Sequence, residues 1–242
     1  MGMPAIRALL LDVDGTLYRQ GLLRGLMALE LSTLPVAMGS VRRALQALRI
    51  LHCFRQVREE LRHRTPTGAP LAQLQYDICG ERAGVVPSEV EHIVSEWMYR
   101  RPLKYLPYCK RSGLEGFITR SVGAGIKVGV FSDYPPQEKL QALGLADSVS
   151  LSLCATDPEI NAFKPQPRGF LRACELWGLP PRDVLYVGDR LDVDVGGAVA
   201  AGMPCALLTG SVKGLKPLPY SADNIVTFTS FQGLAHVLHT HH

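Results

Sequence analysis

The sequence has no long apolar run and no closely spaced pair of cysteines. Its 242 residues include 6 cysteines, none of which forms a Cys-x-x-Cys pair. This spacing argues against a zinc site or a local redox motif, and we interpret the cysteines as small buried apolar residues. No apolar stretch approaches the ~20 residues of a membrane-spanning helix, and the N-terminus shows no charged-then-apolar signal segment with a cleavage site. We therefore expect a cytoplasmic protein with no membrane partner.

Aromatic residues are also scarce, at 7% of the chain, although the net charge is +4. The positive excess lies in one segment: residues 18–105 hold 13 Lys and Arg against 8 Asp and Glu, whereas the remainder has a balance of −1. A nucleic-acid binding module would interleave aromatic side chains with such basic residues. Since this segment does not, we expect no nucleic-acid partner, and the basic residues either attract an anionic substrate or form a solvated surface.

An apolar segment near the N-terminus ends in two aspartates. Leu9–Leu11 are apolar without alternation, which is typical of a strand covered on both faces of a parallel sheet. Asp12 and Asp14 follow it and share one side, because strand side chains alternate with period two. Two such carboxylates repel each other unless a cation lies between them. Gly15 then allows a sharp turn. A plain strand followed by an Asp/Gly turn is the alternative interpretation.

The rest of the chain has two kinds of pattern. Residues 18–105 are rich in Leu, Arg, Glu and Gln and predict helices near 20–31, 38–64, 69–83 and 87–100. From about residue 106, strands alternate with helices, which predicts an α/β fold with a parallel sheet and right-handed crossovers. Asp12, Ser132 and Asp189 each fall at the carboxyl end of a predicted strand, where such sheets bind ligands.

The longest predicted helix, at 38–64, carries two apolar stripes. One holds Val41, Leu45 and Leu48, and the other holds Ile50, Phe54, Val57 and Leu61. At 100° per residue these stripes lie on roughly opposite sides. We expect this helix to be the centre of a small bundle, packed on both sides.

Four stretches together resemble the haloacid dehalogenase (HAD) superfamily. Its motif I is similar to Asp12-Val13-Asp14-Gly15-Thr16-Leu17, and its motif II is similar to Ser132 with the apolar strand before it. Motif III is similar to Lys164-Pro165, and motif IV is similar to the segment from Gly188-Asp189 through Asp194. The resemblance covers nearly the whole chain. It implies a Rossmann-like core formed by residues 1–17 and 106–242, with residues 18–105 as a helical C1 cap inserted between motifs I and II.

The resemblance also implies roles for single residues. Asp12 would be the nucleophile, and Asp14 the acid and base, with a pKa near the working pH. Ser132 and Lys164 would contact the transferring phosphoryl group, together with Gly15 and Thr16. Mg²⁺ would be held by Asp12, Asp189 and the backbone carbonyl of Asp14. Asp194 would orient this metal shell, with Asp192 as a rival.

These roles favour a Mg²⁺-dependent phosphatase acting on a small phosphorylated metabolite through an aspartyl-phosphate. A phosphomutase or phosphotransferase would use the same chemistry, and a nucleic-acid binding module is an alternative of another class. One residue departs from the motif pattern: Asp133 stands where a neutral residue usually follows the motif II serine. A third carboxylate near a phosphate is unfavourable unless it points away or meets a cation.

Overall fold

The computed structural model describes residues 6–33, 39–62, 69–210 and 224–239. It divides into two compact units, one formed by residues 1–19 with 110–242 and the other by residues 20–109. These boundaries lie within a few residues of the predicted ones. No helix among the described residues combines the length and the apolar character needed to cross a membrane.

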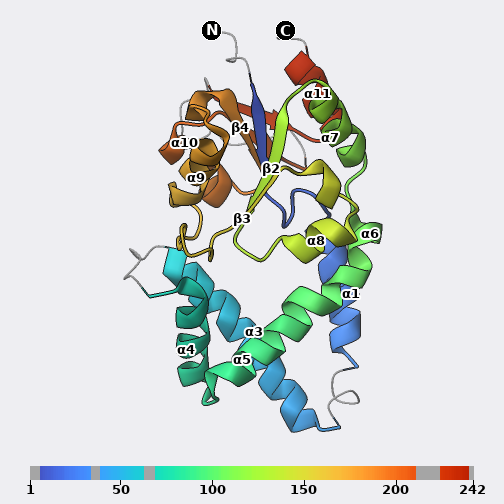
Figure 1. Cartoon of the computed structure of the whole chain (residues 1–242). Helices are drawn as coiled ribbons and strands as arrows, with labels where there is room; N and C mark the ends of the chain where they lie inside the picture. Colours follow the sequence, from blue (N-terminus) through green and yellow to red (C-terminus); the bar gives the residue numbers. More distant parts are fainter. Residues whose placement is uncertain (1–5, 34–38, 63–68, 211–223, 240–242) are drawn as a thin grey trace. The chain divides into compact units, whose positions relative to one another are not determined.

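The first unit is built on a parallel six-stranded sheet (Figure 1). Its strands run β3-β2-β1-β4-β5-β6 across the sheet, and every neighbouring pair is parallel. The strands are β1 (Ala8–Leu11), β2 (Lys127–Ser132), β3 (Leu151–Cys154), β4 (Val184–Gly188), β5 (Cys205–Leu208) and β6 (Ile225–Phe228). The predicted parallel α/β core is therefore confirmed.

Helices cover both faces of this sheet. Figure 1 shows α7 (Leu114–Gly123) and α11 (Phe231–His239) on one side, and α9 (Arg168–Trp177) and α10 (Gly196–Ala201) on the other. The remaining helical segments of this unit are α8 (Gln137–Ala142), η3 (Ala146–Ser148), η4 (Pro181–Asp183) and the π-helical turn η5 (Leu191–Val195). With both faces covered, every residue of the central strand β1 is fully buried, which explains its uninterrupted apolar sequence.

The second unit is entirely helical in its described part. It holds α1 (Gln20–Leu31), α3 (Val41–Arg62), α4 (Leu71–Ala83), α5 (Pro87–Val94), the π-helical η1 (Ser95–Arg100), the 3₁₀-helical η2 (Arg101–Tyr105) and α6 (Leu106–Cys109). Pro87 begins α5 at a position where its missing N–H costs nothing. The assignment of this unit as a C1 cap stays a prediction.

The two-sided packing predicted for the long helix is wrong. The helix is continuous over α3, and the stripe with Ile50, Phe54 and Val57 is buried as expected. On the other stripe, Val41 is 64% and Leu45 57% exposed. Periodicity identifies the faces of a helix, but it does not show whether a neighbour covers each face.

A close contact in the core of the first unit leads to a prediction about stability. Phe131 at the end of β2 packs edge-on against Phe170 of α9, with ring centroids 5.2 Å apart. A Cβ on Gly169 would overlap the Phe131 ring. We expect Gly169→Ala to lower the free energy of unfolding by about 1–3 kcal/mol, because overpacking displaces the ring. Urea denaturation measures this change.

Gly123→Ala is the matched control for this prediction. Gly123 ends α7, is exposed, and has no heavy atom within 4 Å of a built Cβ. Alanine there should be neutral or stabilising by up to about 1 kcal/mol, since it reduces the freedom of the unfolded chain. Equal urea midpoints for the two variants would contradict the packing account.

Candidate active site

The carboxyl ends of neighbouring strands bring the predicted site residues together. Asp12 follows β1, Ser132 ends β2 and Asp189 follows β4, and the register pairs Leu11 with both Val130 and Val187. The backbone N–H of Asp12 continues the ladder by donating to the Val187 carbonyl at 2.8 Å. The loop after β3 supplies Lys164. These side chains therefore share one edge of the sheet, as the sequence predicts.

Lys164 is the centre of a buried polar network. Its Nζ donates to Asp12 Oδ1 at 2.6 Å, to Asp194 Oδ1 at 2.7 Å and to the Tyr186 hydroxyl at 3.0 Å. Burial opposes its charge, but the carboxylates of Asp12 and Asp194 outweigh this effect and raise the pKa of Lys164 well above its usual value. Lys164 is therefore an ammonium group at neutral pH.

Asp194 is fully engaged by protein donors. Its Oδ1 accepts from Lys164 and from the Tyr186 hydroxyl at 3.0 Å. Its Oδ2 accepts the backbone N–H groups of Asp189 at 3.1 Å and Arg190 at 2.9 Å, which fixes the turn after β4. Asp192, its rival, lies on the surface in an ion pair with Arg190. Asp194 thus holds the other site residues in place.

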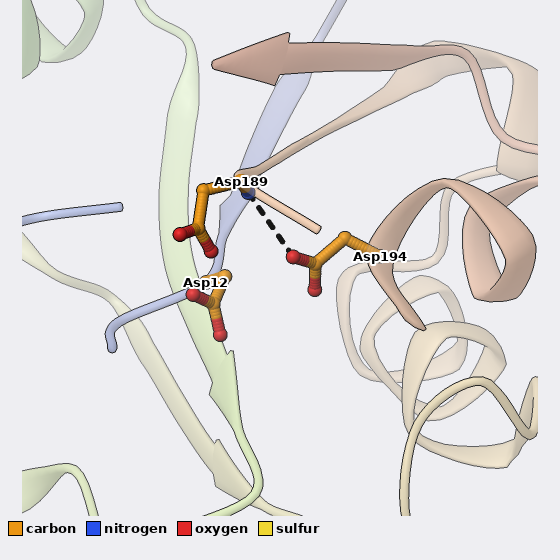
Figure 2. A group of neighbouring side chains, drawn as sticks. All are labelled: Asp12, Asp189 and Asp194. Carbon is orange, nitrogen blue, oxygen red and sulfur yellow. Dashed lines mark hydrogen bonds between the residues drawn. The ribbon is translucent and has the colours of Figure 1, made fainter. Parts of the chain in front are cut away.

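Three carboxylates of the site form a candidate metal centre. Ligand atoms of Asp12, Asp189 and Asp194 lie within 4.8 Å of one another (Figure 2). Burial and the nearby Asp194 raise the pKa of Asp189 to about 6. Burial, reinforced by neighbouring carboxylates, also raises the pKa of Asp12, against the opposing charge of Lys164. A hard divalent cation bound by oxygen ligands would relieve this repulsion, so the donor set fits Mg²⁺.

The turn that follows the two motif I aspartates is shaped around Asp189. Gly15 has a φ of 105°, and a Cβ at this position would overlap the Asp189 carboxylate. Only glycine fits both the backbone conformation and the available space. Thr16 Oγ1 donates to Asp12 Oδ2 at 3.1 Å, and Arg111 donates twice to the Gly15 carbonyl, at 2.7 and 3.1 Å. In this structure Thr16 orients Asp12.

Asp14 occupies a separate, cationic environment. Lys139 Nζ, from α8, lies 2.6 and 2.7 Å from its two carboxylate oxygens. Ser132 Oγ donates to it at 3.2 Å, and the Tyr18 hydroxyl donates as well. Burial alone would raise the pKa of Asp14, but the Lys139 charge and these hydrogen bonds outweigh burial and lower it. The expectation of a pKa near the working pH is thus not met in this state of the protein.

Sequence reasoning missed Lys139, Tyr18 and Arg111. Lys139 is 125 residues from Asp14 in sequence, and no motif marks it. Tyr18 directly follows the motif I segment, and its hydroxyl donates back to Asp14, four residues earlier. Arg111 is half-buried and fixes a backbone carbonyl rather than a side chain. None of the three has a pattern of its own in the sequence.

Asp133 contacts the backbone of the loop that carries Lys164. Its Oδ1 accepts the backbone N–H of Lys164 at 3.1 Å, and the residue is buried. It therefore ties the loop after β2 to the loop that carries Lys164. Its negative charge also adds to the stabilisation of the Lys164 ammonium.

Comparison with known proteins agrees with this geometry. The model of the family of haloacid dehalogenase-like hydrolases matches residues 6–202. A glyceraldehyde 3-phosphate phosphatase of Methanopyrus kandleri is 28% identical over 82% of this chain and 82% of its own. A phosphoserine phosphatase of Thermus thermophilus is 30% identical over 57% of this chain and 53% of its own.

A solved structure shares the fold. The HAD-hydrolase YfnB of Bacillus subtilis, solved with bound magnesium, has a TM-score of 0.66 at 15% identity and covers 98% of this chain and 100% of its own. The family match spans the strands and loops that carry the aspartates, the serine and the lysine of the site. The chain belongs to the haloacid dehalogenase-like hydrolases.

Proposed function

We propose that this chain is a Mg²⁺-dependent phosphatase that cleaves a small phosphomonoester through an aspartyl-phosphate on Asp12. One observation carries the proposal: Asp12 lies at the end of the central strand, 2.6 Å from the Lys164 ammonium and within a group of carboxylates suited to a cation. The similar proteins named for glyceraldehyde 3-phosphate and phosphoserine support a small phosphomonoester as the substrate class.

The first half-reaction forms a bond between Asp12 and phosphorus. A carboxylate oxygen of Asp12 attacks in line with the leaving oxygen, whose bond to phosphorus breaks. Mg²⁺ held by Asp12, Asp189 and the carbonyl of Asp14 would neutralise the repulsion between the nucleophile and the anionic substrate. Lys164 keeps Asp12 in place and offsets charge on the transferring group. Ser132, at the same edge, would donate to a phosphoryl oxygen.

Asp14 moves the protons in both half-reactions. Protonated, it donates to the leaving oxygen; ionised, it takes a proton from the water that then attacks the acyl phosphate. Lys139 makes the Asp14 carboxyl a stronger acid, but it also reduces the fraction of Asp14 that is protonated at neutral pH. Because phosphomonoesters have a second pKa near ~6, part of the substrate enters with the proton that the first step requires.

Asp12→Asn should abolish phosphate release while the fold is kept. The amide is nearly isosteric but cannot form the acyl phosphate, so we expect a loss of at least about 10³-fold in kcat, or ~4 kcal/mol. A colorimetric phosphate assay across a panel of phosphorylated metabolites measures this. Asp192→Asn, at an exposed aspartate outside the network, is the control and should keep full activity. Unchanged turnover of the Asp12→Asn variant would show that Asp12 is not the nucleophile.

Mg²⁺ binding should depend on pH through Asp189. Since the pKa of Asp189 is raised to about 6, protons compete with the metal for this carboxylate increasingly as the pH falls below 6. We expect the Mg²⁺ dissociation constant to rise by up to about tenfold per pH unit as the pH falls below 6. Isothermal titration calorimetry at pH 5 and pH 7 measures this constant. Asp189→Asn should bind Mg²⁺ weakly at both pH values. Equal Mg²⁺ affinities of the unaltered protein at pH 5 and pH 7 would contradict the assignment of Asp189 as a metal ligand.

Removing the Lys139 charge should raise the pKa of Asp14, because this charge lowers it in the intact protein. In Lys139→Met, the alkaline limb of the kcat/KM profile, where Asp14 loses the proton that the first half-reaction needs, should therefore move to higher pH. Lys139→Arg keeps the charge and should shift the limb less. The profile of phosphate release from pH 4 to pH 9 tests this, with thermal denaturation to verify folding. A limb that stays in place in a folded Lys139→Met protein would show that Asp14 does not control it.

A phosphomutase would give a different product pattern. It would pass the phosphoryl group from Asp12 to a sugar rather than to water, and would need a bisphosphate primer. Release of inorganic phosphate from an aryl phosphate without such a primer therefore supports the phosphatase.

A further inference from the structure

Two cysteines of the helical unit lie on helices that pack against each other. Cys53 lies on α3 and Cys79 on α4, and these helices lie side by side (Figure 1). Their interface is fixed by the stacked rings of Phe54 and Tyr76, with centroids 5.6 Å apart, and by the bond from Arg58 Nε to Gln75 Oε1 at 3.1 Å. The cysteines therefore lie within a well-packed contact.

The contacts of Cys79 place the two sulfur atoms close together. Cys79 Sγ donates to the Ile50 carbonyl at 3.6 Å. Ile50 and Cys53 are three residues apart on α3, so they lie one above the other on the same side of the helix. Consistent with this, Cys53 is one of the neighbours that raise the pKa of the Cys79 thiol. A disulfide requires sulfur atoms and Cβ atoms that approach each other closely without movement of the backbone.

We propose that Cys53 and Cys79 are an oxidisable thiol pair, which a peroxide converts to a disulfide linking α3 to α4. This proposal does not depend on the phosphatase assignment, because both residues belong to the helical unit, whereas the catalytic candidates belong to the other. The separation of the two cysteines in sequence explains why no Cys-x-x-Cys pattern indicates them.

The different environments of the two thiols determine the order of the steps. Cys53 is partly exposed, whereas Cys79 is fully buried. Burial, with the neighbouring Cys53, raises the pKa of the Cys79 thiol to about 12, so it stays protonated. The peroxide therefore meets Cys53 first, and Cys79 resolves the product.

Atoms and electrons balance over two steps. The Cys53 thiolate attacks one peroxide oxygen, the O–O bond breaks, and one water leaves, with Cys53 as the sulfenic acid. The Cys79 sulfur then attacks the Cys53 sulfur. The S–O bond breaks, the S–S bond forms, and the departing hydroxide leaves with the Cys79 proton as a second water. Two thiols lose two electrons, and the peroxide is reduced.

The crosslink should stabilise the helical unit. It closes a loop between residues 53 and 79, which restricts the unfolded chain without requiring new contacts in the folded one. We expect a higher denaturation temperature after oxidation, and its return after treatment with dithiothreitol.

The experiment treats the folded full-length protein with hydrogen peroxide, then alkylates the remaining thiols under denaturing conditions and digests with trypsin. We expect a loss of two alkylated thiols and a linked pair of peptides, residues 50–55 with residues 65–82. Cys53→Ala and Cys79→Ala should each abolish the linked pair and the gain in denaturation temperature. Cys174→Ala, which removes a buried cysteine of the other unit, should leave both unchanged.

Two outcomes would overturn the proposal. One is overoxidation of Cys53 to sulfinic acid with Cys79 fully alkylated, which would show that the buried thiol does not resolve the intermediate. The other is full alkylation of both residues after a peroxide treatment that oxidises a free thiol control to completion.

Discussion

The buried ammonium group of Lys164 is the interaction on which the site depends. It links Asp12, at the end of β1, to Asp194 beyond β4, and it reaches both from the loop after β3. Without it, two buried carboxylates would face each other with no positive charge between them. Breaking a buried ion pair by removing one partner typically costs ~3–5 kcal/mol, a large fraction of the total stability of a domain. Asp133 and Tyr186 hold this lysine from two further directions.

The site separates two kinds of carboxylate by their surroundings. Asp12 and Asp189 lie with Asp194 in a group whose mutual repulsion favours a bound cation. Asp14, only two residues from Asp12, is instead neutralised by Lys139 and receives hydrogen bonds from Tyr18 and Ser132. The first group is thus suited to hold a cation, whereas Asp14 is held in an ion pair with Lys139.

The sequence was sufficient to predict the parallel core, and the motif pattern was sufficient to name Asp12, Asp14, Ser132, Lys164 and Asp189. These residues follow apolar strands, and strand ends converge in a parallel sheet. Lys139 could not be named, because its contact with Asp14 depends on where the fold places α8, which no periodicity encodes. The apolar stripe of α3 with Val41 and Leu45 was expected to be buried but is exposed, because helix periodicity does not show which faces a neighbour covers. The Cys53 and Cys79 pair likewise depends on helix packing rather than on local spacing.

The most direct test of the account is to trap the phosphorylated enzyme. The protein is mixed with Mg²⁺ and p-nitrophenyl phosphate, quenched rapidly in acid, and treated with borohydride, which reduces an aspartyl-phosphate to homoserine. Mass spectrometry of the peptide that contains Asp12 then locates the change. We predict homoserine at position 12, and none when the phosphate ester is omitted. Turnover of the ester without homoserine at position 12, or with homoserine at another aspartate, would contradict the account.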